Sequence, residues 1–304
     1  MKIGIAMARE RRNWPTRRLA KAFGEQGCEV KAFCLKDVTV HLSTGDTVFM
    51  LPRRHVLDVE AVILRSIGGG STDQITSRIS VLECMEFAGI RVFNRTYSHR
   101  RAKDKLATLV WLAHKGIPIP DTTITERMAA ALAATRRHGD VVSKPLRGSQ
   151  GQGVLRLQDL DLAFRIFKVL QTADQIMFIQ KFIETPQKDA QGKPIPPRDI
   201  RVMVVGGRAL GAMYRYAKPG KWKANVAQGG RPKKCPLTAE IEELAVKAAN
   251  ALEMDFAGID LLEAKTGLLV SECNSAPNWA GFQKVTGIDV AQEIADHVLQ
   301  ELRA

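Results

Sequence analysis

The sequence has little that would commit the chain to a membrane, a disulfide framework or a zinc site. The longest apolar run near the N-terminus, Ile3 to Met7 with Gly4 inside it, is too short for a signal peptide or a membrane span. The five cysteines are odd in number and lack paired metal-type spacing, which favours reduced buried thiols. We therefore expect a cytoplasmic protein with no membrane partner.

Acidic and aromatic residues are also scarce. Lys and Arg number 45 against 32 Asp and Glu, which gives a formal net charge of +13. This excess steers anionic partners toward the protein, although a merely solubilising surface explains it equally well. Only 6% of residues are aromatic and no nucleic-acid-binding motif occurs, so nucleic acid is not the expected partner. The absence of GxxxxGK[ST] excludes a P-loop.

The sequence does contain alternating strand and helix patterns. Its 304 residues, 45% of them hydrophobic, suffice for about two domains. Over residues 1–97 the patterns predict an α/β domain with a mostly parallel sheet. Its expected strands are 1–7, 30–35, 61–64 and 90–93, with helical periodicity at 19–23 and 79–88. We interpret Gly68-Gly69-Gly70 as a flexible strand-to-helix connection rather than a nucleotide loop.

Beyond residue 97 the pattern becomes mixed. An amphipathic helix is expected over 103–115, and Ile117-Pro118-Ile119-Pro120 ends it because proline disfavours helix at the preceding position. Mixed strands and helices then predict an α+β arrangement. The expected strands are 141–144, 176–182, 200–205, 209–216, 258–263 and 268–274, and the helices are 160–170, 239–252 and 290–302. The polar segment 185–198 is predicted to be an exposed loop.

Three oxygen-bearing residues lie on a predicted β-hairpin. A three-residue loop of Lys265, Thr266 and Gly267 would place Asp260 directly opposite Glu272. Asn274, two residues along the strand from Glu272, would then share their face. The alternative is a solvated hairpin with scattered acids, but the surrounding residues are apolar.

Two opposed carboxylates repel each other unless a cation lies between them. Oxygen ligands in this number suit Mg²⁺, which completes its octahedron with water and nucleotide phosphates. Asp260, Glu272 and Asn274 are therefore predicted metal ligands.

A second candidate site is the strand 141–144 and the glycine-rich stretch that follows it. Lys144 supplies positive charge there, and the glycines would let the backbone amides of Gly148, Ser149, Gln150 and Gly151 approach phosphate oxygens. A flexible surface turn is an equally good interpretation of this glycine-rich stretch taken alone. The hairpin decides in favour of phosphate, because Mg²⁺ and a phosphate-covering loop are complementary parts of one nucleotide site.

Six ordered motifs between about residue 60 and residue 298 resemble those of ATP-grasp ligases. They are Arg101 to Leu106, Lys144 with Gly148 to Gly153, Ile179 to Ile183, Asp199 to Arg201, Asn225 with Gly229-Gly230, and Asp260 with Glu272 and Asn274. The run Thr286 to Val290 resembles the RimK-type branch, whose members attach L-glutamate. The resemblance implies an ATP-grasp fold after the N-terminal α/β domain. It divides the chain into an N-terminal domain, 1–97, a small lid domain, 98–183, and a C-terminal metal-binding domain, 184–304.

The resemblance also implies residue roles. Lys105 and Lys144 would contact ATP phosphates, and Lys181 with Phe182 would form the hinge segment against adenine. Further nucleotide contacts would come from Asp199, Lys223 and Asn225, and the basic groups near the reacting carboxylate would be Arg201 and Arg215. The cofactors implied are ATP and two ions of Mg²⁺ or Mn²⁺.

Alternatives stay open at three of these positions. Arg201 could pair only with Asp199, and Lys105 could be a solvated helix lysine. Arg215 shares a face with Asp199 and Arg201 if the hairpin loop has three residues, Gly206 to Arg208, but not if it has two.

Two departures from the family pattern concern the hinge and the acceptor. Lys181 stands where the hinge of the family usually has an acidic residue. This difference need not abolish adenine binding, because the hinge recognises adenine mainly through backbone groups. Arg147 stands where the RimK-type enzyme carries an acid in the loop. Lys144 to Leu146 and Ala227 to Gly230 are closer to ligases that glutamylate small cofactors such as tetrahydromethanopterin.

The implied activity is ATP-dependent ligation of L-glutamate to a carboxylate acceptor through an acyl phosphate. The expected acceptor is a small anionic cofactor, with a ribosomal protein C-terminus or another carrier protein as the alternative. A non-catalytic nucleotide-binding regulator and a nucleic-acid or ribosome-associated protein are rivals from other classes. A homo-oligomer, either dimer or tetramer, stays open.

Overall fold

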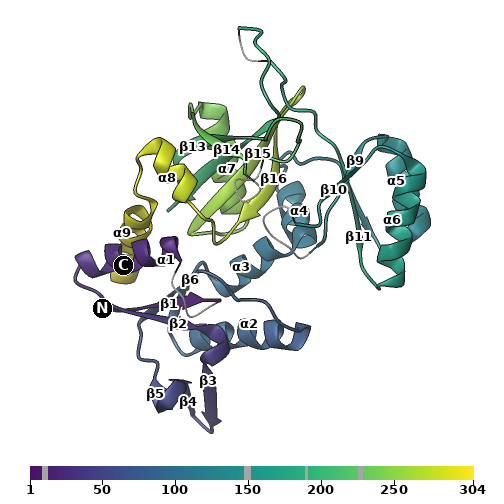
Figure 1. The fold of residues 1–304 in the computed structure, drawn as a ribbon. Helices are drawn as coiled ribbons and strands as arrows, with labels where there is room; N and C mark the ends of the chain where they lie inside the picture. The colour runs from purple at the N-terminus through teal and green to yellow at the C-terminus, as the bar shows by residue number, and fades with distance from the viewer. Residues whose placement is uncertain (9–12, 147–151, 189–190, 225–228) are drawn as a thin grey trace.

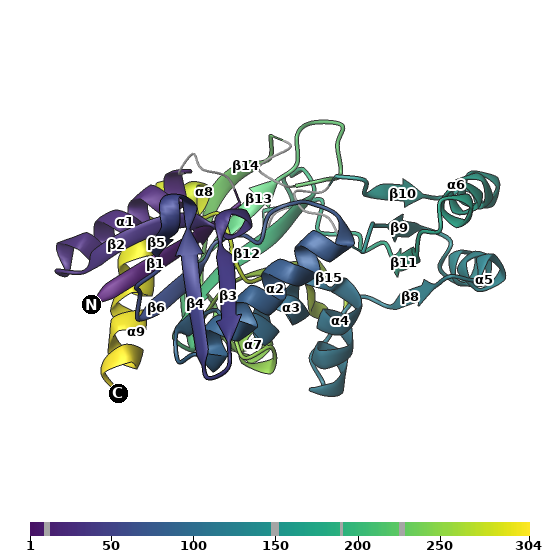
Figure 2. The same cartoon turned by 90° about the horizontal axis from the view of Figure 1, so that it is seen from below.

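The structure is a computed structural model that describes residues 1–8, 13–146, 152–188, 191–224 and 229–304 (Figure 1). It contains a parallel N-terminal sheet, a small antiparallel sheet that projects to one side with its two helices, and a large antiparallel sheet (Figures 1 and 2). No helix among the described residues is long and apolar enough to cross a membrane. None of the five cysteines, all of which lie among the described residues, forms a disulfide; three are buried and two half-buried.

The N-terminal sheet has the order β2-β1-β6-β7, and its strands are parallel. The predicted parallel sheet is therefore confirmed. The central strands β1 and β6 are almost continuously apolar because helices or loops cover both faces. The elements are β1 (Lys2–Met7), α1 (Trp14–Glu25), β2 (Glu29–Cys34), β6 (Ala61–Leu64), α2 (Thr72–Phe87) and β7 (Arg91–Phe93). As predicted, Gly68 to Gly70 connect β6 to α2, which starts at a capping box formed by Ser71 and Gln74.

A three-stranded antiparallel sheet lies between β2 and β6 in the sequence, and the sequence analysis did not predict it. It consists of β3 (Thr39–Ser43), β4 (Asp46–Leu51) and β5 (His55–Val56), with short 3-10 turns at Leu35–Asp37 and Pro52–Arg54. Most of its side chains are exposed, and only Phe49 is fully buried. β3 does alternate polar and apolar residues, but β4 does not, and the apolar Leu42 of β3 is exposed rather than buried.

Two helices occupy the region where one was predicted. α3 (Thr96–Lys103) ends where α4 (Lys105–His114) begins. Asp104 separates them, since its carboxylate accepts hydrogen bonds from the backbone N–H groups of Leu106 and Ala107. The helix expected over 103–115 therefore starts two residues later, and Lys103 closes the preceding helix.

The projecting sheet, here called the lid sheet, has the order β10-β9-β11-β8 and is antiparallel. Its elements are β8 (Thr122–Thr125), α5 (Met128–His138), β9 (Val141–Ser143), β10 (Leu155–Leu157), α6 (Leu160–Thr172) and β11 (Met177–Lys181). Both helices cover one face (Figure 2) and enclose a small core that includes Ala131, Phe167 and Ile179. β8, α5 and β10 were not predicted.

The large sheet, here called the main sheet, has the order β14-β13-β12-β15-β16 and is antiparallel. One face packs on α7, around Val202, Ala245 and Ile259. The other face packs on α8 and α9, around Phe256, Phe282 and Ile294. The elements are β12 (Arg198–Val205), β13 (Arg208–Tyr216), β14 (Arg231–Cys235), α7 (Ala239–Ala251), β15 (Phe256–Ala264), β16 (Gly267–Asn274), α8 (Ala280–Thr286) and α9 (Val290–Arg303).

The N-terminal sheet and the main sheet share one hydrophobic core. α9 lies against α1 and β12, so that Ile5 of β1 and Ile294 of α9 belong to the same buried cluster as Met203. Figure 1 shows α1 and α9 side by side beneath the main sheet. Two segments at opposite ends of the described sequence are thereby joined.

Asn94 fixes the end of β7 to the main sheet. Its amide nitrogen donates to the carbonyl oxygens of Phe256, at 2.8 Å, and Ser275, at 2.7 Å. Its amide oxygen accepts from the backbone N–H of Phe256 at 3.1 Å. The side chain is fully buried, so water cannot replace these bonds.

We expect Asn94→Ala to lower the free energy of unfolding by about 2–4 kcal/mol, since three buried hydrogen bonds are lost and two carbonyl oxygens and one N–H are left without a partner. Urea denaturation of both proteins measures the difference. Asn250→Ala, at an exposed position of α7, is the matched control. Equal unfolding midpoints for the Asn94 and Asn250 variants would contradict this role.

Candidate active site

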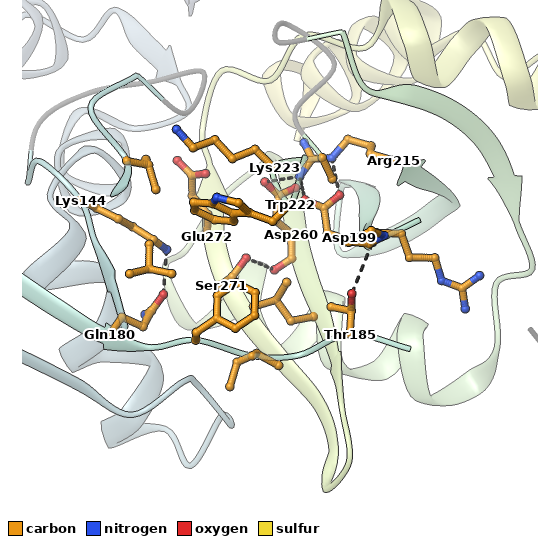
Figure 3. Close-up of a pocket in the computed structure, with 18 of the residues that line it drawn as sticks. Lys144, Gln180, Thr185, Asp199, Arg215, Trp222, Lys223, Asp260, Ser271 and Glu272 are labelled. Atoms are coloured by element: carbon orange, nitrogen blue, oxygen red, sulfur yellow. Dashed lines mark hydrogen bonds and ion pairs between the residues drawn. The ribbon is translucent and has the colours of Figure 1, made fainter. Parts of the chain in front are cut away.

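A cavity lies between the lid sheet and the main sheet, and it brings together most of the predicted site residues. They are Lys105, Lys144, Lys181, Phe182, Asp199, Arg215, Lys223, Asp260 and Glu272. Figure 3 shows Lys144 and Gln180 on the lid side, facing Asp260, Ser271 and Glu272 on the strands of the main sheet. We call this space the main cavity.

The hairpin that carries Asp260 and Glu272 has a shorter loop than predicted. Ala264 pairs with Gly267, so the loop has two residues and the prediction of three is wrong. A β-bulge between Asp260 and Leu261 then shifts the register by one residue. Asp260 therefore pairs with Glu272, as predicted, although the physical reason differs.

The neighbouring hairpin of β12 and β13 shows the same compensation. Val205 pairs with Arg208 across a two-residue loop, the case in which Arg215 was not expected on the face of Asp199. A bulge between Met203 and Val204 restores the other register, and Asp199 pairs with Arg215. The expectation that a two-residue loop would separate them is therefore wrong.

The two bulges bring four charged side chains into one buried network. Arg201 makes a two-nitrogen contact with Asp260, and its Nη2 lies 2.8 Å from Oδ2. Arg215 bonds to Asp199, at 2.6 and 2.7 Å, and its Nη2 lies 2.9 Å from Asp260. Arg201 thus pairs with Asp260 rather than with Asp199, the pairing left open by the sequence.

The network shifts the pKa values of its two carboxylates in opposite directions. Burial raises the pKa of Asp260, but the charges of Arg201 and Arg215 outweigh burial and hold that pKa below its usual range. Burial keeps the pKa of Asp199 above its usual range despite the charge of Arg215. Asp260 is therefore firmly ionised, and its negative charge is balanced by protein groups.

The fit of a divalent cation therefore depends on Glu272 and Asn274. The opposed carboxylates were predicted to need a cation between them, whereas guanidinium groups meet that need on the side of Asp260. The side chain of Glu272 has no hydrogen bond or ion pair with any described residue. The amide nitrogen of Asn274 donates to the carbonyl oxygen of Gly258 at 3.3 Å. Among described residues, no three His, Cys, Asp or Glu side chains come close enough to hold a metal.

One free carboxylate and one amide oxygen suit Mg²⁺, which takes few protein ligands and keeps water or phosphate oxygens. Glu272 and Asn274 thus fit the ion, and Asp260 would have to share its oxygens with two guanidinium groups. Asn274 lines a second cavity beside the first, and Glu272 lines both.

Two lysines form the cationic wall opposite Glu272. Lys105, at the first position of α4, donates to the carbonyl oxygens of Pro145, at 2.9 Å, and Leu146, at 3.0 Å. Lys144 donates to Oε1 of Gln180 at 2.7 Å. Burial lowers the pKa of Lys144 to about 8, against the opposing effect of Glu272, and burial also lowers the pKa of Lys105. Lys105 is therefore not a solvated helix lysine.

Two aromatic side chains, Phe182 and Trp222, also line the main cavity. The rings of Phe182 and Trp222 meet edge to face with centroids 5.8 Å apart. The guanidinium of Arg156 lies 3.7 Å from the centre of the Phe182 ring. The backbone N–H groups of Lys181 and Phe182 donate to the carbonyl oxygens of Asp121 and Asp140, so this segment is anchored.

The structure leaves several predicted residues untested and adds others. Arg147, Gly148, Ser149, Gln150, Gly151 and Asn225 lie outside the described residues. Arg201 lies behind the cavity wall, where it holds Asp260. The sequence analysis missed Gln180, Trp222 and Arg198, which also line the cavity. Of these three, only Trp222 could have been singled out from the sequence, because it lies between two lysines in a chain with few aromatic residues.

Comparison with known proteins places this geometry in a family. The RimK-like ATP-grasp domain matches residues 102–298. A tetrahydromethanopterin:alpha-L-glutamate ligase of Methanosarcina acetivorans is 31% identical, over 98% of both chains. A protein of the same name from Methanocaldococcus jannaschii is 35% identical over 71% of this chain and 72% of its own. A probable alpha-L-glutamate ligase of Aliivibrio fischeri is 32% identical over 98% of this chain and 95% of its own.

Solved structures agree with this chain in fold. The ATP-grasp ligase PsnB, solved with a minimal precursor, Mg and ADP, superposes with a TM-score of 0.72, covering 99% of this chain and 98% of its own at 18% identity. A RimK domain ATP-grasp protein of Sphaerobacter thermophilus gives 0.70, over 98% of this chain and all of its own, at 22% identity. The fold class predicted from the sequence is confirmed.

The lowered pKa of Lys144 predicts a pH dependence of nucleotide binding. Only the ammonium form attracts phosphate, so raising the pH from 7 to 9 through a pKa of about 8 should weaken MgADP binding by up to roughly tenfold. Isothermal titration at several pH values measures the loss. Lys144→Arg keeps its charge over this range and should bind MgADP with a much flatter pH profile. Parallel profiles for the two proteins would refute the assignment.

Proposed function

The chain belongs to the RimK-like ATP-grasp family, and from that premise we propose that it joins L-glutamate to a carboxylate on a small anionic cofactor. It is an ATP-dependent alpha-L-glutamate ligase of the ATP-grasp type. The observation that carries the proposal is the main cavity, where lysines of the lid sheet face Glu272 and Arg215 of the main sheet. Such opposed walls suit a polyanion held together with a divalent cation.

ATP would lie lengthwise in the main cavity. Phe182, Trp222 and the apolar residues Val142, Ile183 and Leu262 offer a slot for adenine. The triphosphate would then extend toward Lys105 and Lys144, whose positive charges line the cavity opposite Glu272. Lys223 lines the same cavity.

The metal belongs at the phosphate end. Glu272 and Asn274 are the residues that would hold Mg²⁺ or Mn²⁺, which when bound neutralises charge on the phosphates. Arg215, fixed between Asp199 and Asp260, presents its guanidinium at the cavity wall without freedom to move. It is therefore suited to stabilising charge that builds up on the transferred phosphoryl group.

The reaction proceeds in two steps. A carboxylate oxygen of the acceptor attacks the γ-phosphorus of ATP, the bond to the bridging oxygen breaks, and ADP leaves. The neutral amino group of L-glutamate then attacks the carbonyl carbon of the acyl phosphate, phosphate departs, and the amine nitrogen loses a proton as the amide forms. The protein has to position and neutralise charge rather than supply a nucleophile.

The small-cofactor acceptor rests on two supports. Two of the relatives named for tetrahydromethanopterin match 98% of the chain. The net charge of +13 favours an anionic substrate. Incubation with MgATP, L-glutamate and a pterin or deazaflavin cofactor that ends in a carboxylate should release ADP and add glutamyl units, detected by mass spectrometry. Modification of a ribosomal protein C-terminus alone would replace this acceptor with the carrier-protein alternative.

Glu272→Gln should lower kcat/KM for ligation by roughly 100-fold or more, because it removes the one unpaired carboxylate of the metal site. The loss is read as ADP released per enzyme in the presence of glutamate and acceptor. Glu242→Gln, on the exposed side of α7, is the matched control and should keep full activity. An equally active Glu272→Gln enzyme with an unchanged metal requirement would remove Glu272 from the site.

A further inference from the structure

Residues of β16 and of the loop after it lead from the main cavity to two positively charged side chains, Arg65 and Lys103, and neither forms an ion pair with a residue that the structure describes. Strand β16 passes Glu272 and Asn274 and continues as a loop through Ser275, Pro277 and Trp279. Glu272, Asn274 and Ser275 line the second cavity, which also contains Lys103 at the end of α3. The second cavity therefore connects the predicted phosphate end with the junction of α3 and α4.

Arg65 is the first of the two cations. It follows β6 at the carboxyl edge of the N-terminal sheet and is only 8% exposed. Its Nη2 donates to the carbonyl oxygen of Pro277 at 2.7 Å, and its guanidinium lies 4.6 Å from the centre of the Trp279 ring. Its Nε and Nη1 are buried without a hydrogen-bond partner. No carboxylate of a described residue pairs with it, and burial lowers its pKa to about 10.

A buried guanidinium in this state is costly, since an unpaired charge away from water loses several kcal/mol of hydration. Stacking on Trp279 and a single carbonyl oxygen compensate only in part. An apolar side chain would pack on Trp279 without that cost, although it would leave the carbonyl oxygen of Pro277 without its donor. Arg65 lines neither of the two cavities described above, so an anion in the second cavity would offset its charge without a direct hydrogen bond.

Lys103 is the second cation, and it faces the second cavity. Lys103 is exposed over part of its surface, and its side chain has no hydrogen bond or ion pair with any described residue. Burial of the rest of the side chain lowers its pKa, and the charge of Glu272 acts in the opposite direction. The charge of Lys103 and that of Arg65 also lower the pKa of His99, after burial, to about 3. His99 is therefore neutral; its Nδ1 bonds to the hydroxyl of Ser275, and its Nε2 is buried without a partner.

We propose that Lys103 and Arg65 form a subsite for a substrate carboxylate, placed next to the phosphate end of the main cavity. It rests on the proposed function and deepens it, since ligation brings two carboxylate-bearing molecules to this point. Lys103 contacts the carboxylate directly from the second cavity, and Arg65 adds charge from beneath the loop 275–279. The favoured source is L-glutamate, whose own carboxylates must be held while its amine attacks.

Direct binding tests the subsite independently of turnover. Protein loaded with MgADP is titrated with L-glutamate, with glutarate and with the neutral isostere glutaramide. The carboxylates should bind and glutaramide should not. Lys103→Gln should weaken carboxylate binding roughly 10- to 100-fold through the loss of a charge-assisted contact. Lys115→Gln, exposed at the far end of α4, should change nothing. Equal carboxylate affinity in Lys103→Gln and wild type, or no binding at all, would overturn the proposal.

Arg65 requires a variant that separates charge from folding. Arg65→Met should weaken carboxylate binding and Arg65→Lys should restore part of it, while MgADP affinity and the unfolding temperature of Arg65→Lys stay near those of wild type. The Lys103 variant carries the test if Arg65→Met does not fold. If Arg65→Met binds carboxylates as well as Arg65→Lys does, Arg65 acts through packing alone.

Steady-state kinetics identify the source of the carboxylate. If it is L-glutamate, Lys103→Gln raises the KM for glutamate at least tenfold and leaves the KM for ATP and kcat within about threefold. If the acceptor supplies it, the acceptor KM rises instead. Unchanged KM values for both substrates would refute the subsite. Carboxylate binding through Lys103 without glutamate-dependent ADP release would refute the proposed function and leave the subsite standing.

Discussion

The pairing of Arg201 and Arg215 with Asp260 is the interaction on which the site depends. It ties β12, β13 and β15 together at the point where their side chains meet the main cavity. Buried ion pairs contribute little net stability, but removal of one partner costs about 3–5 kcal/mol because the other charge is left without compensation. The network therefore acts as a rigid unit. It also leaves Glu272 as the carboxylate that the protein does not neutralise.

The two hairpins show why the sequence predicts some features and not others. Facing pairs were inferred by counting residues from the loop. The loop between β15 and β16 was counted one residue too long, and the loop between β12 and β13 has the two residues that were expected to separate Arg215 from Asp199. The pairs were still those expected for Asp260, because a bulge between Asp260 and Leu261 adds the residue that the loop lacks. A bulge leaves no mark in the hydrophobic pattern, so its position could not be predicted. Parallel strands with both faces buried, such as β6, were easy to identify.

The missed parts of the site are contacts between segments far apart in sequence. Arg65 becomes notable only when Pro277 and Trp279 surround it, and no local pattern connects them. The same holds for Gln180, which bridges Lys144 to the hydroxyl of Thr122. Motifs that combine glycine, lysine and acidic residues are visible locally, and these the sequence did indicate. The three-domain division of the chain stays a prediction.

The packing of α9 against α1 has a consequence for how the chain acquires its structure during synthesis. A ribosome releases β1 and α1 long before α9, yet residues of all three bury one another in a single core. The apolar side of the N-terminal segment, including Ile5 and Leu19, therefore remains uncovered while most of the polypeptide is being made. Exposed surface of this kind is what chaperones bind. The shared core can therefore be completed only after α9 has been translated, even if the strands of the N-terminal sheet pair earlier.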